Sequence, residues 1–199
     1  MAATGERIAY EQEVDMEAVD AGLLVLRIFI GLLMVAHGTQ KLFGWFNGYG
    51  VRGTGAYFAS LGYPAGMLMA VLTGSVEAGG GAALGAGFLT PLVSLAFVAL
   101  FVNVAWTGHA HSFWNHNQPY GIEYPLVLAV VSATFALTGP GTHSLDAAFG
   151  WAIFGPGWFA AATLGGFAAG LAALSLRRRQ AEIVAAPDAP EASSDERVA

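Results

Sequence analysis

Three charged side chains that could take part in chemistry lie within or beside long apolar segments: Arg27, Glu77 and Glu123. Glu77 stands in the middle of LMAVLTGSVEAGGGAALGAGF, residues 68–88. A carboxylate in such surroundings can relay a proton or bind a polar ligand, and an arginine there can hold an anion or a quinone carbonyl. We therefore treat these three residues as the candidates for catalysis. The same charges could instead pair and decide which helix faces which.

A second group of polar side chains could bind a cofactor. His37 and Lys41 are four positions apart, so they share one face of a helix. Asn103 and His109 follow near the end of a later apolar segment, and Tyr124 opens the next one. At a helical rise of about 1.5 Å per residue, all five would lie within about 10 Å of one membrane boundary. We expect them to converge there.

Three of the five histidines fall in one connecting segment. His109, His111 and His116 could chelate zinc or copper, and His37 with His109 could clamp a b-type haem. Alternatively, histidines at a membrane interface form only hydrogen bonds. The chain has no cysteine, which excludes disulfides, thiolate-held iron–sulfur clusters and the c-type haem attachment motif. Redox chemistry would therefore need a bound quinone, a metal or a partner.

The composition predicts that membrane helices position these residues. Of 199 residues, 55% are hydrophobic and 11% are charged, and the mean hydropathy is +0.56. A spanning helix needs about 20 mostly apolar residues, and five such windows are present. We predict an all-α membrane protein, a four-helix transmembrane bundle plus an additional C-terminal transmembrane helix. The windows cover about 21–43, 65–88, 90–109, 122–139 and 151–176.

Depth along the first two windows predicts a partner for Glu77. Arg27 would lie about 9 Å from the outer end of the first window and Glu77 about 18 Å from the inner end of the second. These depths overlap in a hydrocarbon core of about 30 Å. Because a charge at mid-membrane is costly and normally paired, we expect an ion pair between Arg27 and Glu77. A stripe of small residues beside Glu77 should let another helix approach closely: Ala70, Gly74, Ala78 and Ala82.

The two ends of the chain differ from its apolar middle. Residues 1–20 form an acidic segment without the positive start and cleavage site of a secretory signal, so we expect the first span to be retained. Residues 177–199 begin with three arginines and continue as a tail that we expect to be disordered. Because Lys and Arg mark the cytoplasmic side, we expect the N-terminus outside and the C-terminus in the cytoplasm. The net charge of -6 comes mainly from these ends, and no nucleic-acid partner is expected.

Several short motifs recur together: Arg27, His37-Gly38 with Lys41, Leu61-Gly62, Glu77 with its glycines, Glu123-Tyr124-Pro125 and Gly139-Pro140-Gly141 followed by Ser144-Leu145-Asp146. In this combination, over about residues 21–150, the chain resembles the DoxX family of small membrane proteins. The resemblance implies a four-helix bundle in a bacterial plasma membrane. It also implies redox associations, because some members are linked to quinone-dependent oxidation of sulfur compounds and others to membrane oxidoreductase or thiol-stress complexes.

The resemblance also divides the chain. Residues 1–20 would be an acidic N-terminal segment, 21–150 a DoxX-like four-helix membrane domain, 151–176 an additional transmembrane helix and 177–199 a disordered cytoplasmic tail. The family's fourth span usually ends the chain or nearly so, which makes the additional helix a departure. We expect that helix to dock against a partner subunit or a second copy of the chain.

Three functions remain open. The first is a membrane subunit associated with a quinone-linked or respiratory redox system, acting as a quinone-linked oxidoreductase subunit if it is an enzyme. The second is a non-catalytic accessory or scaffold subunit of a larger membrane complex. The third is a small-solute carrier, because a mid-membrane Arg and Glu pair also suits a translocation site. The expected partners are the lipid bilayer and other membrane subunits or further copies of this chain.

Overall fold

The computed structural model describes residues 2–108, 112–114 and 121–177, and within these residues the chain forms seven helices and no strand. The predicted all-α membrane class is confirmed. Each of the five predicted windows coincides with the apolar part of one helix, and two short helices lie between windows. The elements are α1 (Ala2–Phe43), α2 (Gly50–Ser60), α3 (Gly66–Ala86), α4 (Thr90–Gly108), α5 (Glu123–Thr138), α6 (Leu145–Ala148) and α7 (Pro156–Ser175).

Four helices are long and apolar enough to cross a membrane, over Val14–Phe43, Gly66–Ala86, Thr90–Thr107 and Pro156–Ser175. α5 is a shorter apolar helix of 16 residues, about 24 Å long. Large apolar side chains point outward from these helices, as a lipid environment allows. Phe29, Leu32 and Leu164 are 64, 65 and 71% exposed. The chain is therefore a multi-pass membrane protein.

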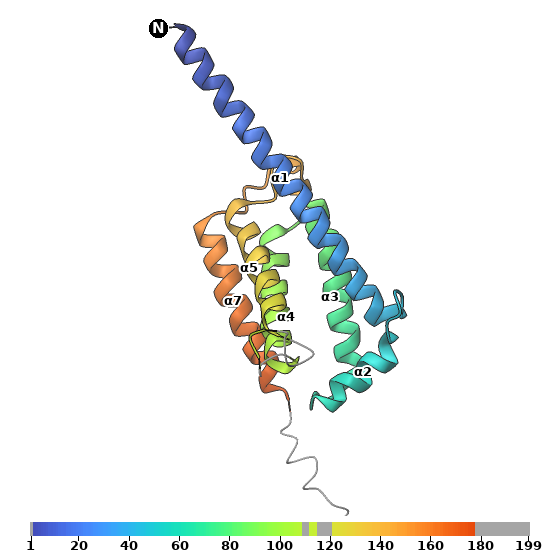
Figure 1. The fold of residues 1–199 in the computed structure, drawn as a ribbon. Helices are drawn as coiled ribbons and strands as arrows, with labels where there is room; N and C mark the ends of the chain where they lie inside the picture. Colours follow the sequence, from blue (N-terminus) through green and yellow to red (C-terminus); the bar gives the residue numbers. More distant parts are fainter. Residues whose placement is uncertain (1, 109–111, 115–120, 178–199) are drawn as a thin grey trace, which may run out of the picture.

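The helices form two groups that meet along α3 and α4 (Figure 1). α1 packs along α3, with α2 beside both, whereas α4, α5 and α7 pack against one another. We call one end of the bundle the α2 end. The opposite end, where α3 turns into α4 beside α6, is called the Asp146 end. The N-terminal part of α1 continues past the Asp146 end (Figure 1). The acidic segment predicted over 1–20 is therefore part of this helix from Ala2 onward.

Small residues bring α1 and α3 into close contact. A Cβ atom added to Gly38 would overlap the backbone nitrogen of Ala78, and one added to Gly31 would lie 2.6 Å from the Gly81 carbonyl oxygen. Gly74 lies in the same contact, so two members of the predicted stripe are confirmed. Ala82 is exposed to the outside, because a strict four-residue spacing drifts off the face of a helix with 3.6 residues per turn.

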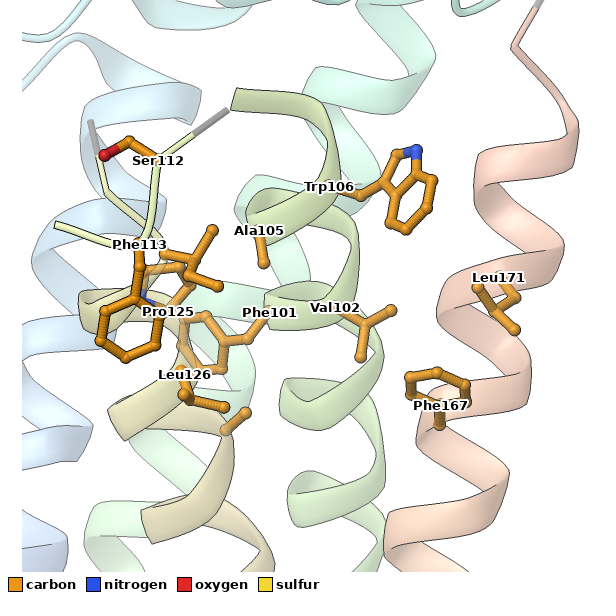
Figure 2. Close-up of a pocket in the computed structure, with 12 residues that line it drawn as sticks. Phe101, Val102, Ala105, Trp106, Ser112, Phe113, Pro125, Leu126, Phe167 and Leu171 are labelled. Atoms are coloured by element: carbon orange, nitrogen blue, oxygen red, sulfur yellow. The ribbon is translucent and has the colours of Figure 1, made fainter. Parts of the chain in front are cut away.

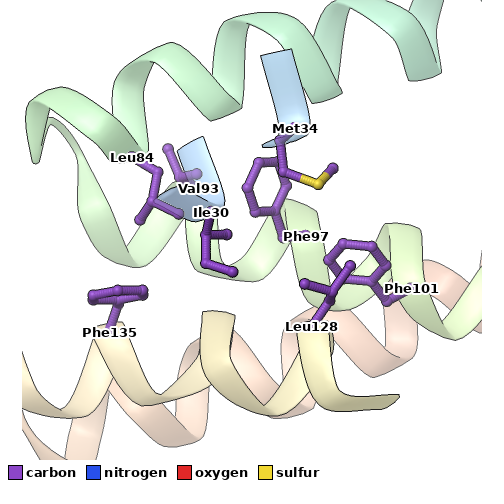
Figure 3. Close-up of a cluster of buried hydrophobic side chains, with 8 residues drawn as sticks. All are labelled: Ile30, Met34, Leu84, Val93, Phe97, Phe101, Leu128 and Phe135. Carbon is purple, nitrogen blue, oxygen red and sulfur yellow. The ribbon is translucent and has the colours of Figure 1, made fainter. Parts of the chain in front are cut away.

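The apolar core joins the two groups (Figure 3). Phe97 of α4 is fully buried, and its ring meets that of Phe101 edge-on with centroids 6.1 Å apart, an arrangement that aromatic rings favour. Side chains from α1, α3, α4 and α5 contribute to this core: Ile30, Met34, Leu84, Val93, Phe97, Phe101, Leu128 and Phe135.

The additional helix predicted over 151–176 is present as α7, and it begins with Pro156 at its first position, where proline is favoured. Its glycine face packs on α4 of the same chain. A Cβ atom added to Gly166 or Gly170 would lie 2.7 Å from the Leu95 carbonyl oxygen or 2.9 Å from that of Ala99. This glycine pair therefore packs within the chain, and docking of α7 against a partner subunit or a second copy stays a prediction for its other face, where Leu164 and Phe167 are exposed.

Candidate functional site

The buried acid Glu77 is paired with Lys41. The Lys41 Nζ atom donates to Glu77 Oε2 at 2.5 Å, and the two side chains are 26% and 5% exposed. Lys41 lies one turn beyond Gly38, where α1 and α3 are in closest contact, so its long side chain reaches back along α1 to Glu77. The close approach of the two helices thus positions the pair.

The expected pair between Arg27 and Glu77 is wrong. Arg27 donates to the carbonyl oxygens of Pro140, at 2.9 Å, and His143, and it lies in the electrostatic field of Asp146. It stands beside Gly87, the residue that ends α3. Glu77 is ten residues earlier on α3, about 15 Å along the axis. The depth estimate counted the first span from residue 21. In the structure, the part of α1 that faces α3 begins only near Arg27, so Arg27 lies at the end of the helix contact and not at the depth of Glu77.

Asp146 holds the other end of this assembly together. Its two carboxylate oxygens accept hydrogen bonds from the backbone N–H groups of Leu89, at 2.7 Å, and Thr90, at 3.0 Å, and from the Thr90 hydroxyl, at 2.7 Å. A carboxylate at the start of a helix caps it and complements its dipole. A hollow of about 330 Å³ adjoins this end, but Asp146 is 1% exposed and already bonded. Arg27, a candidate for catalysis, thus belongs to a group of buried contacts that hold chain segments together at this end.

Two further predicted residues gather around Glu77. The Tyr124 hydroxyl lies 3.4 Å from His37 Nε2, and Tyr124 also lies within electrostatic reach of Glu77. His37 interacts electrostatically with Lys41 on the same helix. We call His37, Lys41, Glu77 and Tyr124 the Glu77 cluster. Its members come from α1, α3 and α5, and because Tyr124 is 50% exposed the cluster reaches the surface of the bundle.

The Glu77 pair lines a cavity of about 600 Å³ between α2, α3, α4 and α7. Most of the lining is aliphatic or aromatic, with few polar groups, the composition typical of sites for apolar ligands. Lys41 and Glu77 supply the charges, and Tyr57, Tyr63, Asn103 and three threonines supply neutral polar groups. The threonines are Thr54, Thr73 and Thr107.

A second polar contact stands on the α4 side of this cavity. The Tyr63 hydroxyl donates to Asn103 Oδ1 at 2.7 Å. Arg177, just past α7, donates from Nε to the Leu61 carbonyl oxygen at 2.7 Å, and its guanidinium lies 5.7 Å from the Tyr63 ring centroid. Burial raises the pKa of the Tyr63 hydroxyl above its usual value, which keeps it a neutral donor. Asn103 was predicted, whereas Tyr63 was missed although it follows the Leu61-Gly62 motif.

The remaining candidates lie elsewhere. Glu123 is the first residue of α5, and its backbone N–H donates to the Phe113 carbonyl oxygen at 3.3 Å. His109, His111 and His116 fall outside the described residues, so metal binding there and a haem held by His37 and His109 stay predictions. Among the residues that are described, no three His, Cys, Asp or Glu side chains are grouped as a metal would need.

A groove of about 490 Å³ lies between α4, α5 and α7, and its lining, among the described residues, has no acid–base or metal-binding side chain (Figure 2). Figure 2 shows Trp106 at its upper part, Phe113 on the left near Pro125, and Phe167 and Leu171 on the α7 side. None of the side chains that line it is titratable. They are Phe101, Val102, Ala105, Trp106, Ser112, Phe113, Ile122, Pro125, Leu126, Ala129, Phe167 and Leu171.

Fold and site together define a helical multi-pass membrane protein with a buried Lys and Glu pair beside an apolar cavity. The chain belongs to the DoxX family, whose model matches residues 22–110. It is 31% identical to the inner membrane protein YqjF of Escherichia coli strain K12 over 127 residues, which are 64% of this chain and 91% of that relative.

Two further relatives share similar stretches. The inner membrane protein YphA of Escherichia coli strain K12 is 30% identical over 130 residues, 62% of this chain and 87% of YphA. CatD of Bacillus subtilis strain 168, named as a candidate oxidoreductase, is 27% identical over 130 residues, 65% of this chain and 88% of CatD. No solved structure matches the chain.

Proposed function

We propose that this chain is a membrane subunit of a quinone-linked redox system and that it holds the quinone in the cavity beside Glu77. The proposal rests on one observation: an apolar cavity and a pair of charged side chains, both of which quinone chemistry needs, occur at the same place. A mostly apolar space of about 600 Å³ suits a ring with an isoprenoid tail, and a partly exposed ammonium and a buried carboxylate stand at its wall. The naming of CatD as a candidate oxidoreductase agrees with this proposal.

The chemistry assigns different tasks to the two members of the pair. Reduction of a quinone adds two electrons and two protons and yields a quinol. The electrons come from a partner oxidoreductase subunit. Lys41 has three N–H donors and uses one for Glu77, so another can bond to a quinone carbonyl oxygen where negative charge develops. The Glu77 carboxylate takes up a proton through His37 and Tyr124 and passes it to the reduced ring, and a second proton follows the same route, so that two electrons and two protons yield the quinol.

The distribution of positive charge supports the proposed orientation. Lys41, Arg52 on α2 and Arg177 all lie at the α2 end. By the positive-inside rule this end faces the cytoplasm of a bacterial plasma membrane and the N-terminus lies outside. The chain has no cysteine, so single Tyr49→Cys and Met16→Cys variants can be labelled in intact cells with a membrane-impermeant maleimide. Labelling of Met16→Cys alone supports this orientation, and labelling of Tyr49→Cys alone reverses it.

Glu77→Gln tests the proposed function. The variant keeps an acceptor for Lys41 but cannot supply a proton, so it should stay folded, bind a short-chain quinone and lose quinone-linked turnover. Binding can be followed by calorimetry in mild detergent and turnover in membranes that contain the partner enzyme. Glu17→Gln removes an exposed carboxylate from α1 and is the matched control. Wild-type protein that binds no quinone, or Glu77→Gln with normal turnover, contradicts the proposal.

An accessory role is the second candidate. It is favoured by the completeness of the Lys41 and Glu77 pair, because a bond of 2.5 Å satisfies both charges within the chain and fixes α1 on α3. In this case a larger redox complex would co-purify with the chain, and its activity would survive Glu77→Gln but fall when the chain is deleted.

A further inference from the structure

A polar contact in the cavity wall lies opposite the Glu77 pair and involves three elements. Asn103 belongs to α4, Tyr63 to the turn before α3, and Arg177 follows α7. Asn103 and Tyr63 line the same cavity as Lys41 and Glu77. The Glu77 cluster described above does not use either residue.

The hydrogen bond from Tyr63 decides which part of Asn103 remains available. The Asn103 Oδ1 atom accepts from the Tyr63 hydroxyl at 2.7 Å. Its Nδ2 group carries two N–H donors, and no group among the described residues accepts a hydrogen bond from them. The amide is therefore oriented as a donor in a cavity wall that is otherwise mostly apolar.

The depth of Asn103 relative to Glu77 suits one ligand that meets both. A Cβ atom added to Gly80 on α3 would lie 2.9 Å from the Phe97 ring on α4, so the ring reaches Gly80, and we take these two positions as a common reference level. Glu77 comes three residues before Gly80, and Asn103 comes six residues after Phe97. Because the helices run in opposite directions, Asn103 lies about 5 Å nearer to the α2 end than Glu77. A single ring with carbonyls on opposite sides can span such an offset.

We propose that the Asn103 amide is the second hydrogen-bond anchor for a dicarbonyl ring in this cavity, with Tyr63 and Arg177 as positioning residues. The proposal rests on the proposed function and adds the residues that decide the pose. Lys41 meets one carbonyl oxygen and Asn103 the other. Tyr63 orients the amide, and Arg177 holds the Tyr63 ring through its cation–π contact and its bond to Leu61.

Arg177 also gives α7 a part in the site. α7 lies outside residues 22–110, the part of the chain that the family model matches. It supplies Ala169, Gly170 and Ala173 to the cavity wall. The additional helix thus completes a site whose Lys41 and Glu77 pair comes from the matched region.

Infrared spectroscopy of a bound short-chain quinone, labelled with ¹³C at one carbonyl or the other, tests the proposal. A hydrogen bond lowers the stretching frequency of the carbonyl that accepts it, so the two anchors can be observed separately. In the wild type both carbonyls should be shifted. Asn103→Leu should release one carbonyl only, and Lys41→Met should release only the other. Tyr63→Phe should broaden the band of the quinone carbonyl that accepts from Asn103. It should also weaken quinone binding about three- to tenfold, the value of one hydrogen bond.

Two further variants separate positioning from general structure. Tyr49→Phe removes a tyrosine hydroxyl that lies outside this cavity, on a residue that is 85% exposed, and should change neither band nor affinity. Arg177→Met should weaken binding about two- to fivefold through Tyr63. If Asn103→Leu and Tyr63→Phe retain both shifted bands and wild-type affinity, the second anchor is ruled out while the proposed function stands. If the wild type binds no quinone, both proposals fail together.

Discussion

The two ends of the bundle hold their buried charges in different ways. At the Asp146 end, Arg27 is 2% exposed and donates to backbone carbonyls, while Asp146 accepts from backbone N–H groups at the start of α4. Toward the α2 end, Lys41 and Glu77 bond to each other and line an apolar cavity. Charges bonded to backbone groups join chain segments, whereas a side-chain pair beside a cavity keeps donors and a proton within reach of a ligand. One cation and one anion therefore serve structure at one end and, as we propose, chemistry at the other.

Asp146→Ala should have the largest effect on stability. It removes the cap of α4 and leaves Arg27 without its buried counter-charge, so the free energy of unfolding should fall by about 3–5 kcal/mol. Tryptophan fluorescence during unfolding in mixed detergent micelles measures this change. Asp15→Ala, at an exposed position of α1, should have almost no effect. Normal stability of Asp146→Ala together with lost quinone binding would reverse the roles of the two ends.

Gly38→Ala should separate α1 from α3 where the Glu77 pair forms. The new methyl group overlaps the backbone of Ala78, and overpacking of this kind costs about 1–3 kcal/mol. Because Lys41 is one turn away on the same helix, quinone affinity should fall as well. Gly22→Ala adds a methyl group with nothing within 4 Å and is the matched control. Equal stability and affinity in both variants would show that close helix contact does not position the pair.

Lys41→Met should cost more stability than the double change Lys41→Met with Glu77→Met. The single variant leaves a buried carboxylate unpaired, and because Lys41 is partly exposed we expect a loss of about 1–2 kcal/mol. The double variant removes both charges and should recover most of that loss. A double-mutant cycle in mixed micelles gives the coupling energy. Additive losses would mean that the two residues act independently, which would remove the contrast between the two ends.

Tyr124→Phe should have the smallest effect on stability. Its hydroxyl lies 3.4 Å from His37, a long hydrogen bond at a half-exposed position, so about 0.5 kcal/mol or less is at stake. If Tyr124 and His37 replace the proton of Glu77, quinone-linked turnover should still fall in this variant while quinone affinity does not. Unchanged turnover would remove Tyr124 from the proposed route.

Sequence alone determined the class of the molecule and the positions of its helices. Apolar windows are a local property of the chain, and each proved to hold a helix, four of them long enough to cross a membrane and α5 shorter. The same reasoning marked Arg27 and Glu77 as buried charges, because any charge inside such a window must be accommodated. The resemblance to the DoxX family rested on short motifs, and the match of the family model over residues 22–110 confirmed it.

Tertiary structure alone decided which charges meet. Arg27 and Glu77 were assigned to one depth, but the register of α1 on α3 depends on Gly31, Gly38 and the small residues opposite them. That register brings Lys41 to Glu77 and carries Arg27 to the Asp146 end. Tyr63 could not be assigned from its neighbours in the chain, because its partners Asn103 and Arg177 lie far away in sequence. Helix formation depends on neighbouring residues, whereas pairing across helices depends on how their surfaces fit.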